Sequence, residues 1–305
     1  METVLILVRQ IIQMFLLAAM GFLLYKGKKV SANGSRAIAN ILIYLSLPAV
    51  IINSFLVDKT AEHIQGILLS AAAAVILLPL SMLISRSIFR KDPIAAFAAA
   101  FPNSGFFGIP LITASVGQGA VFYIACLIAF LNISQWTWGV SLMNGQPVRE
   151  GLKLKKLIQA PFVIAVLMGL FLFFTGWRPP EILGGCLNTA ASLNTPLAMF
   201  TVGIYLAQTD MLRMFRRVSL YSIAAVRLVI IPLILLLLLR LLPAVFSDMR
   251  TALLLAISCP VGSNIAVYAQ LHGKDYPYAV ETVVISTLFS IVTIPAIVWL
   301  TRFIW

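Results

Sequence analysis

Charged side chains are scarce in this chain of 305 residues. Asp, Glu, Lys and Arg together make up 10% of the sequence, hydrophobic residues make up 61%, and the mean hydropathy is +1.01. This balance excludes a soluble globular chain, because several apolar runs reach the roughly 20 residues that a helix needs to cross a bilayer. We therefore predict an all-α polytopic membrane protein with the lipid bilayer as its surroundings.

Groups that carry chemistry are equally few. Cys126, Cys186 and Cys259 lie in apolar segments without a paired spacing, so we expect neither a disulfide nor a metal site. No G-x-x-x-x-G-K-[ST] loop is present, which argues against ATP as the energy source. Within the predicted spans only Glu281 and Arg227 offer charge, and this pair does not suit an intramembrane enzyme. We predict no enzyme activity, no catalytic residues and no cofactor.

The apolar runs predict ten membrane spans. Their centres lie near Met14, Ala49, Val75, Ser104, Leu127, Val166, Leu197, Ile230, Val261 and Ser290. The short connections between these spans alternate sharply in positive charge, and this alternation gives an orientation.

Fifteen Lys and Arg residues fall in the connections on one side of the predicted membrane. They are Lys26, Lys28, Lys29, Arg36, Arg86, Arg90, Lys91, Arg149, Lys153, Lys155, Lys156, Arg213, Arg216, Arg217 and Lys274. The connections and ends on the other side hold only Lys59, Arg178, Arg240, Arg250 and Arg302. The positive-inside rule makes the crowded side cytoplasmic, so we predict a multi-pass protein of the cytoplasmic (inner) membrane with both termini extracytoplasmic. The net charge of +12 then reflects topology, and we expect no nucleic-acid partner.

Two of the predicted spans are interrupted by residues that break helices. The run Phe101–Pro110 contains two prolines, two glycines, an Asn and a Ser, and Cys259–Asn264 contains a proline, a glycine, a Ser and an Asn. Lipid cannot satisfy the backbone groups that such breaks expose, so the breaks must be buried in protein or line a cavity. A matching pair of interrupted helices, one in each half, indicates the substrate site of a secondary transporter.

The two halves of the chain resemble each other. Gly21 precedes Pro48 by the same 27 residues that separate Gly169 from Pro196, and the segment 94–121 resembles 253–280 with Pro102 matching Pro260. Five spans in each half is an odd number, so the second half must be inverted relative to the first. We predict a first repeat over 1–142, a basic cytoplasmic linker over 143–156 and an inverted second repeat over 157–305.

The first break carries a recognisable motif. Its residues Pro102 to Leu111 read P-N-S-G-F-F-G-I-P-L and resemble the P-N-[ST]-G-F-x-G-I-P-L signature of the auxin efflux carrier family. The segment Leu197–Ala207 is similar to the seventh span of that family, and Arg227 with Pro232 resembles the basic-then-proline pattern of its eighth span. The chain is identified as a bacterial type of member, related to the plant PIN-formed auxin exporters, with the likeness extending over its whole length.

The resemblance implies a fold like that of bile-acid symporters and sodium/proton antiporters, in which two broken helices cross at the bilayer centre. It further implies a scaffold, 1–60 plus 157–212, that forms a homodimer, and a moving transport unit, 61–142 plus 213–305. Family substrates are mostly small organic anions such as malonate and malate in bacteria and indole-3-acetate in plants. The second break departs from the plant pattern at Val261 and at Ser263-Asn264, which argues against auxin itself.

Crossed half-helices bring two helix N-termini together, and their free N–H groups and partial positive charge suit a carboxylate. We expect substrate contacts from the break residues Asn103, Ser104, Gly105, Gly262, Ser263 and Asn264. Pro102, Pro110 and Pro260 are interpreted as architecture.

Other polar residues of the spans leave alternatives open. Asn132 and Gln135 share a helix face and either line the cavity or hydrogen-bond between helices. Asn194 and Ser46 occupy matching positions beside prolines, facing the crossing. Arg227 either neutralises the half-helix C-termini or binds the anion.

Glu281 has two interpretations as well. It is either a proton carrier or an interfacial carboxylate that reaches water or pairs with Arg227 or Lys274.

The sequence thus predicts a secondary active carrier of a small organic anion, a carboxylate, that works by alternating access. The alternatives are a sodium-coupled symporter of the bile-acid type, which needs acidic or amide ligands near the crossing, and a passive anion channel.

Overall fold

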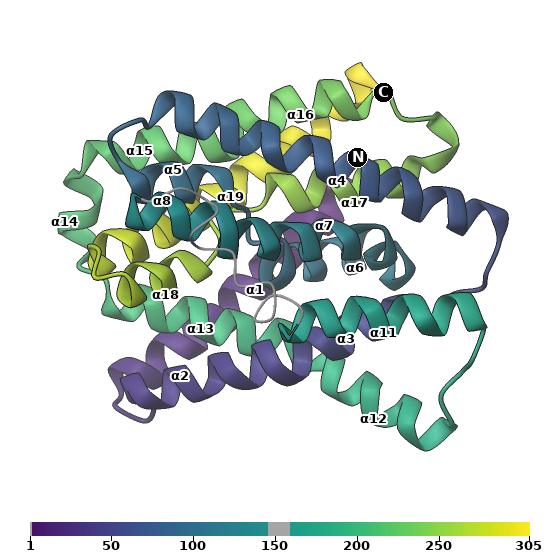
Figure 1. The fold of residues 1–305 in the computed structure, drawn as a ribbon. Coiled ribbons are helices and arrows are strands. Elements are labelled where there is room, and N and C mark those ends of the chain that lie inside the picture. Colours follow the sequence, from purple (N-terminus) through teal and green to yellow (C-terminus); the bar gives the residue numbers. More distant parts are fainter. Residues whose placement is uncertain (1, 146–158) are drawn as a thin grey trace.

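The computed structural model describes residues 2–145 and 159–305, so the predicted linker lies outside the described residues from position 146 onward. The helices of the first part are α1 (Glu2–Lys26), α2 (Ala32–Ile41), η1 (Leu42–Ser46), α3 (Leu47–Ser54), α4 (Ala61–Ile88), α5 (Pro93–Ala100), η2 (Ser104–Gly108), α6 (Ile109–Ser115), η3 (Gln118–Ala120), α7 (Val121–Ser134), η4 (Gln135–Gly139) and α8 (Val140–Asn144). Figure 1 shows these helices gathered into one bundle.

The second part is helical in the same way. Its helices are α11 (Pro161–Thr175), α12 (Glu181–Ser192), α13 (Asn194–Gln208), α14 (Met211–Arg216), α15 (Val218–Ala225), η5 (Val226–Ile230), α16 (Ile231–Leu239), η6 (Ala244–Phe246), α17 (Ser247–Ser258), α18 (Asn264–Leu271) and α19 (Tyr276–Ile304). Over the described ranges the structure contains no strand, only one isolated backbone bridge between Pro102 and Val261. The prediction of an all-helical protein is confirmed.

Seven helical segments of the described residues are long and apolar enough to cross a membrane. They are Thr3–Lys26, Asn33–Ser54, Ala61–Ile88, Gln118–Asn144, Glu181–Gln208, Val218–Leu239 and Tyr276–Ile304. Each coincides with a predicted span. Of the remaining three predictions, the sixth is the shorter apolar helix Pro161–Thr175, and the fourth and ninth are the interrupted helices. A polytopic membrane protein is confirmed, while the count of ten spans stays a prediction.

Three of the helices contain a widened turn directly before a proline. The N–H groups of Leu47, Ile109 and Ile231 each bond to the carbonyl five residues earlier, and Pro48, Pro110 and Pro232 follow them. Proline lacks an N–H and its ring clashes with the preceding turn, and a π-type turn relieves both problems. These sequence positions therefore widen the helix locally without ending it.

Helices α1 and α13 approach each other unusually closely. A Cβ atom added to Gly203 would lie 1.9 Å from the carbonyl oxygen of Ala18, and one added to Gly21 would lie 2.5 Å from that of Phe200. Only glycine allows this backbone contact, in the manner of small residues at membrane helix interfaces. The pair α1–α13 forms one side of the molecule together with α3, which packs against α11 and α12.

The other side of the molecule contains the interrupted helices. Here α4 packs against α5 and α7, α17 packs against α7 and α16, and α19 packs against α15 and α18. Helix α1 also contacts α6 and α19, and α13 also contacts η2 and α19, so the two sides share a core. The first break and its neighbours belong to this core, since Ala98, Phe101 and Phe107 are fully buried.

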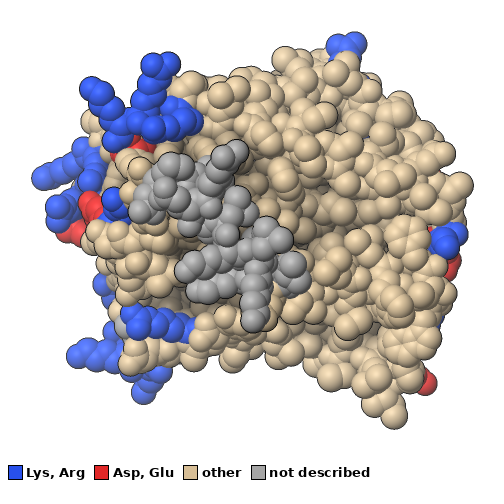
Figure 2. Space-filling view, in the orientation of Figure 1, with Lys and Arg blue, Asp and Glu red and all other residues tan. Residues whose placement is uncertain are grey.

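Basic side chains gather at one end of the bundle. Figure 2 shows most of the Lys and Arg atoms at the left end, where Figure 1 places α14 and α18, while the broad middle is almost free of charge. An uncharged middle band flanked by polar ends is the surface of a protein that sits in a bilayer.

Candidate functional site

The two breaks pair with each other. The N–H of Asn103 donates to the carbonyl oxygen of Pro260 at 2.8 Å, and the N–H of Gly262 donates to that of Phe101 at 3.0 Å. These two bonds form the antiparallel bridge between Pro102 and Val261. Each break thereby satisfies backbone groups that the other exposes, which is the condition for irregular backbone at membrane depth.

Side chains and small residues support this pairing. The Ser104 hydroxyl donates to the carbonyl oxygen of Ala256 at 2.7 Å, and the Ser286 hydroxyl accepts from the N–H of Val261 at 3.0 Å. A Cβ atom on Gly262 would lie 3.2 Å from the carbonyl oxygen of Pro102, so glycine permits the close approach of the two chains.

The half-helices run from opposite ends of the bundle to this crossing. In Figure 1, α5 and α18 lie on the left of the molecule and α6 and α17 lie on the right. The bonds between the breaks hold the C-terminal ends of α5 and α17 close together. They also hold the N-terminal end of η2–α6 close to the N-terminal end of α18. Both interrupted segments therefore present a helix N-terminus at the crossing.

A cavity of about 1270 Å³ opens beside the crossing. Among the residues that line it are the break residues Pro102, Asn103, Ser104, Gly105, Gly262, Ser263 and Asn264, together with Asn132 and Gln135. All six break residues predicted to contact substrate thus lie on one cavity, and so do both polar residues from the fifth predicted span.

Two buried amide groups at this cavity have no partner. The side-chain NH₂ groups of Asn103 and Gln135 make no hydrogen bond with any described residue, although Asn103 is 5% exposed and Gln135 is 1% exposed. Leaving a buried donor unpaired costs about 1–3 kcal/mol. Both residues line the cavity, and an acceptor within hydrogen-bond distance of these NH₂ groups would remove this cost, so the two groups are candidate ligand contacts.

The amides of the cavity are held by neighbouring groups. Asn264 donates its NH₂ to the side-chain oxygen of Gln135 at 3.0 Å, which leaves the Gln135 NH₂ as the free end of that side chain. Asn132 donates to the carbonyl oxygen of Ile128 in its own helix at 2.8 Å. Gln135 therefore both lines the cavity and bridges between helices, combining the two alternatives that the sequence left open.

Two predicted residues do not line this cavity. Asn194 is buried behind it and donates to the carbonyl oxygen of Gly105 at 3.3 Å, so it contacts the crossing from α13. Ser46 is fully buried at the end of the widened turn η1, and its hydroxyl has no hydrogen-bond partner among the described residues.

Arg227 contacts the crossing without lining the cavity. Its fully buried guanidinium donates to the carbonyl oxygens of Ala99 at 3.0 Å and Ala100 at 3.1 Å, and also to that of Ile257. These are carbonyls of the last turns of α5 and α17. The observed contacts are those of the first alternative, a cation at the half-helix C-termini, and Arg227 is not among the residues that line the cavity.

Glu281 pairs with a residue that the sequence interpretation did not consider. Its carboxylate accepts from Arg217 at 3.0 Å, rather than from Arg227 or Lys274, and Arg217 also lies 3.5 Å from Asp275. Partial burial lowers the pKa of Arg217, but the hydrogen bond and charge of Glu281 and the charge of Asp275 outweigh it, so the pKa ends above its usual value. Arg217 further stacks on the ring of Tyr278.

Sequence reasoning missed several further residues that line the cavity. Tyr25, Arg36, Tyr205, Gln208, Tyr268, His272 and Tyr276 line it as well. In the sequence, Arg36 served only to orient the chain in the membrane, because positive charge near a membrane surface is common. Nothing in the sequence indicated that the loop before α19 returns to the cavity, where the Tyr276 hydroxyl donates to Gln208 at 3.2 Å.

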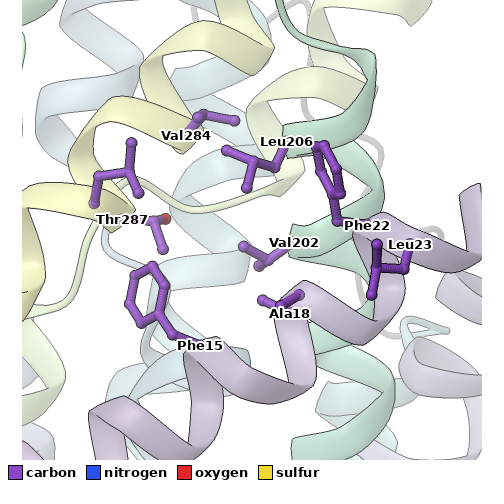
Figure 3. A pocket seen from close by; sticks show the side chains of 10 residues that line it. Phe15, Ala18, Phe22, Leu23, Val202, Leu206, Val284 and Thr287 are labelled. Atoms are coloured by element: carbon purple, nitrogen blue, oxygen red, sulfur yellow. The ribbon is translucent and has the colours of Figure 1, made fainter. Parts of the chain in front are cut away.

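A second cavity, of about 320 Å³, lies between α1, α13 and α19. Figure 3 shows Phe15, Phe22, Val202, Leu206 and Val284 pointing into it. Among the described residues that line it, Thr287 alone has a polar side chain, and its hydroxyl donates to the carbonyl oxygen of Val283 in its own helix. This cavity offers an anion no free donor, so the larger one is the candidate site.

Seven apolar helices, two interrupted helices and a polar cavity at their crossing define a membrane transport protein. A family model described as "Membrane transport protein" matches residues 6–298, and the chain belongs to this family, the auxin efflux carriers that the motif of the first break predicted. The chain is also 27% identical over 277 residues to a protein of Rhizobium meliloti (strain 1021) named "Putative malonate transporter", with 86% of this chain and 85% of the relative covered.

Proposed function

We propose that this protein is a secondary active carrier of a small organic anion, a carboxylate, which binds where the two broken helices cross. One observation carries the proposal: the cavity combines two unpaired, buried amide donors with a lining that contains no carboxylate among the described residues. A cation site is built from oxygen ligands, often with a carboxylate among them, whereas an anion requires hydrogen-bond donors.

The electrostatics of the cavity favour an anion. Helix N-termini at the crossing carry partial positive charge, and each interacts favourably with an anion by about 0.3–1 kcal/mol or more where water is excluded. Arg36 supplies one full positive charge to the described lining, and no Asp or Glu opposes it. The donors of Asn103 and Gln135 would fix the position of the carboxylate oxygens.

Malonate is the first substrate to test, because the relative in Rhizobium meliloti is named for its transport. The cavity holds about 1270 Å³, which is far more than a three-carbon dicarboxylate fills. Water would occupy the remainder, as it does in many polar sites. Larger carboxylates therefore belong in the same screen.

Alternating access is supported by the position of the cavity. Its lining includes Tyr25, Arg36 and His272 next to the basic connections, and none of the described residues 54–60, 116–119, 175–181 or 240–247 at the opposite end. With the basic end cytoplasmic by the positive-inside rule, this is an inward-open state. An inverted repeat of five plus five spans would supply the outward-open state by exchanging the roles of its halves.

The remaining architecture follows from the same proposal. The group around α1, α3, α11, α12 and α13 would be the static scaffold, and the group around the broken helices would move. Both termini would be extracytoplasmic in the inner membrane, and a homodimer would form through the scaffold. Arg227 would hold the crossing together from behind.

A thermal-shift screen of the purified protein against mono- and dicarboxylates tests the substrate class. A ligand that binds only the folded protein raises its Tm. We expect malonate or a related carboxylate to raise the Tm of the wild type, and we expect Asn103→Ala to weaken its binding about 10- to 100-fold through the lost charged hydrogen bond.

Gln65→Ala is the matched control, because Gln65 is an exposed amide of α4 that does not line the cavity. It should bind like the wild type. If Asn103→Ala and the wild type bind every effective carboxylate equally well, the site is not at the crossing.

A further inference from the structure

The strongest unexplained feature outside the cavity is the full burial of Arg227. Its side chain lies in the widened turn η5 and has 0% exposure, and it makes its hydrogen bonds to the carbonyls of Ala99, Ala100 and Ile257. Two of these oxygens belong to the last turn of α5 and one to the last turn of α17. A single cation therefore joins the C-terminal ends of both half-helices.

The positive charge of Arg227 is balanced by backbone carbonyls rather than by a carboxylate. Over the described residues, Arg227 forms no ion pair with a carboxylate. Each helix C-terminus is equivalent to about half a negative charge, so the two together match the one positive charge of the guanidinium. The C-terminal ends and carbonyls of broken helices are also the groups that coordinate a sodium ion in carriers built in this way.

We propose that the Arg227 guanidinium is a permanently bound cation which takes the place of a coupling sodium ion at the crossing. The carbonyls of Ala99, Ala100 and Ile257 are already bonded to it, and a sodium ion has no access to them while the side chain stays. Rather than binding and releasing Na⁺ in each cycle, the protein keeps the positive charge covalently attached. This inference rests on the proposed carrier function.

Two properties follow. The stability of the wild type and its binding of anions do not depend on Na⁺. Removal of the side chain leaves three buried carbonyls without their donors, next to a space of guanidinium size, and an added cation should then become stabilising.

The experiment compares the Tm of purified wild type, Arg227→Ala and Arg227→Lys in buffers that contain choline, sodium or guanidinium chloride at equal, low concentration. We expect the wild type to give the same Tm in sodium and choline. Arg227→Ala should lose about 5–15 °C, as for the breaking of a buried charge interaction, and regain part of it in guanidinium but not in choline. Arg227→Lys, which keeps the charge, should lose less.

Arg250→Ala is the matched control. Arg250 is also a buried arginine, but it stacks on Trp305 and lies near the opposite end of α17. Its loss of Tm should not be recovered by guanidinium. Equal recovery in both variants, or no recovery in Arg227→Ala, overturns the inference.

The wild type alone keeps the test decisive if Arg227→Ala does not fold. A wild-type Tm that rises with Na⁺ overturns the inference. Malonate binding that occurs only in Na⁺ overturns it too but leaves the carrier standing. If no carboxylate shifts the Tm in any buffer, the proposed substrate class fails while the guanidinium recovery still tests the role of Arg227.

Discussion

At the scale of single residues, the candidate site presents amide donors at the crossing and one charged side chain, Arg36, elsewhere in its described lining. Asn103 and Gln135 bring donors that nothing in the described chain satisfies, and Asn264 orients one of them. A carboxylate gains from such donors only if it is desolvated there, because each bond in the folded protein replaces one to water. If the protein is the proposed carrier, its specificity should therefore respond to the position of these amides more than to the net charge of the cavity.

Glu281 gives a prediction at the same scale. Its side chain is 7% exposed and bonded to Arg217, which is the setting of a structural ion pair rather than of a free proton carrier. We expect Glu281→Gln to lower stability by about 1–3 kcal/mol, since the ion pair with Arg217 is replaced by a hydrogen bond to an uncharged acceptor. Uptake of the substrate should keep its dependence on a proton gradient, if it has one.

The measurement is uptake into proteoliposomes with and without an imposed pH difference. Arg217→Gln serves as the control, because it breaks the same pair from the other side. Loss of the proton dependence in Glu281→Gln but not in Arg217→Gln would assign proton coupling to Glu281 and contradict this account.

At the scale of helices, the sequence predicted the breaks well and their pairing only through resemblance. Prolines and glycines at 102, 105, 108 and 110 disfavour a regular α-helix, so the sequence itself indicates that the helix is interrupted there. The bonds from Asn103 to Pro260 and from Gly262 to Phe101 join residues about 160 positions apart, and no local rule predicts them. The widened turns before Pro48, Pro110 and Pro232 were also not foreseen, although their cause is local.

The contact between α1 and α13 gives a prediction for an element. The backbone of Gly203 lies so near Ala18 that any side chain must push the two helices apart. We expect Gly203→Ala to lower the free energy of unfolding by more than about 3 kcal/mol, at the upper end for overpacking of a core. The Tm and the monodispersity of the purified protein would report this loss.

Gly184→Ala in α12 is the matched control. Nothing lies within 4 Å of a Cβ atom added there, so the change should be neutral or slightly stabilising through its helix propensity. A Gly203→Ala protein as stable as Gly184→Ala would show that the close approach of α1 and α13 is not maintained in the membrane.

At the scale of the whole molecule, the charge distribution was the most reliable sequence signal. The alternation of Lys and Arg between connections reappears as the basic end in Figure 2. The sequence could not predict towards which end of the bundle the cavity opens. That direction depends on how the helices around α13 pack against the helices around α19. The Tyr276–Gln208 and Asn194–Gly105 hydrogen bonds across that boundary join residues far apart in sequence.

Orientation can be tested by labelling single cysteines with a reagent that does not cross the membrane, in a background without the three native cysteines. We expect Lys28→Cys at the basic end to react only from the cytoplasmic side and Glu181→Cys only from outside. Asn40→Cys, which lines the cavity, should react from the cytoplasmic side and be protected by malonate. Reaction of Lys28→Cys from outside would reverse the assigned orientation.

The most direct test of the central claim is counterflow of labelled malonate into proteoliposomes that are preloaded with unlabelled malonate. The account predicts that internal malonate accelerates uptake and produces a transient accumulation in the wild type and in Gln65→Ala, and that Asn103→Ala abolishes both. Uptake that internal malonate does not accelerate would indicate a channel, and an Asn103→Ala protein with the wild-type response would contradict a substrate site at the crossing.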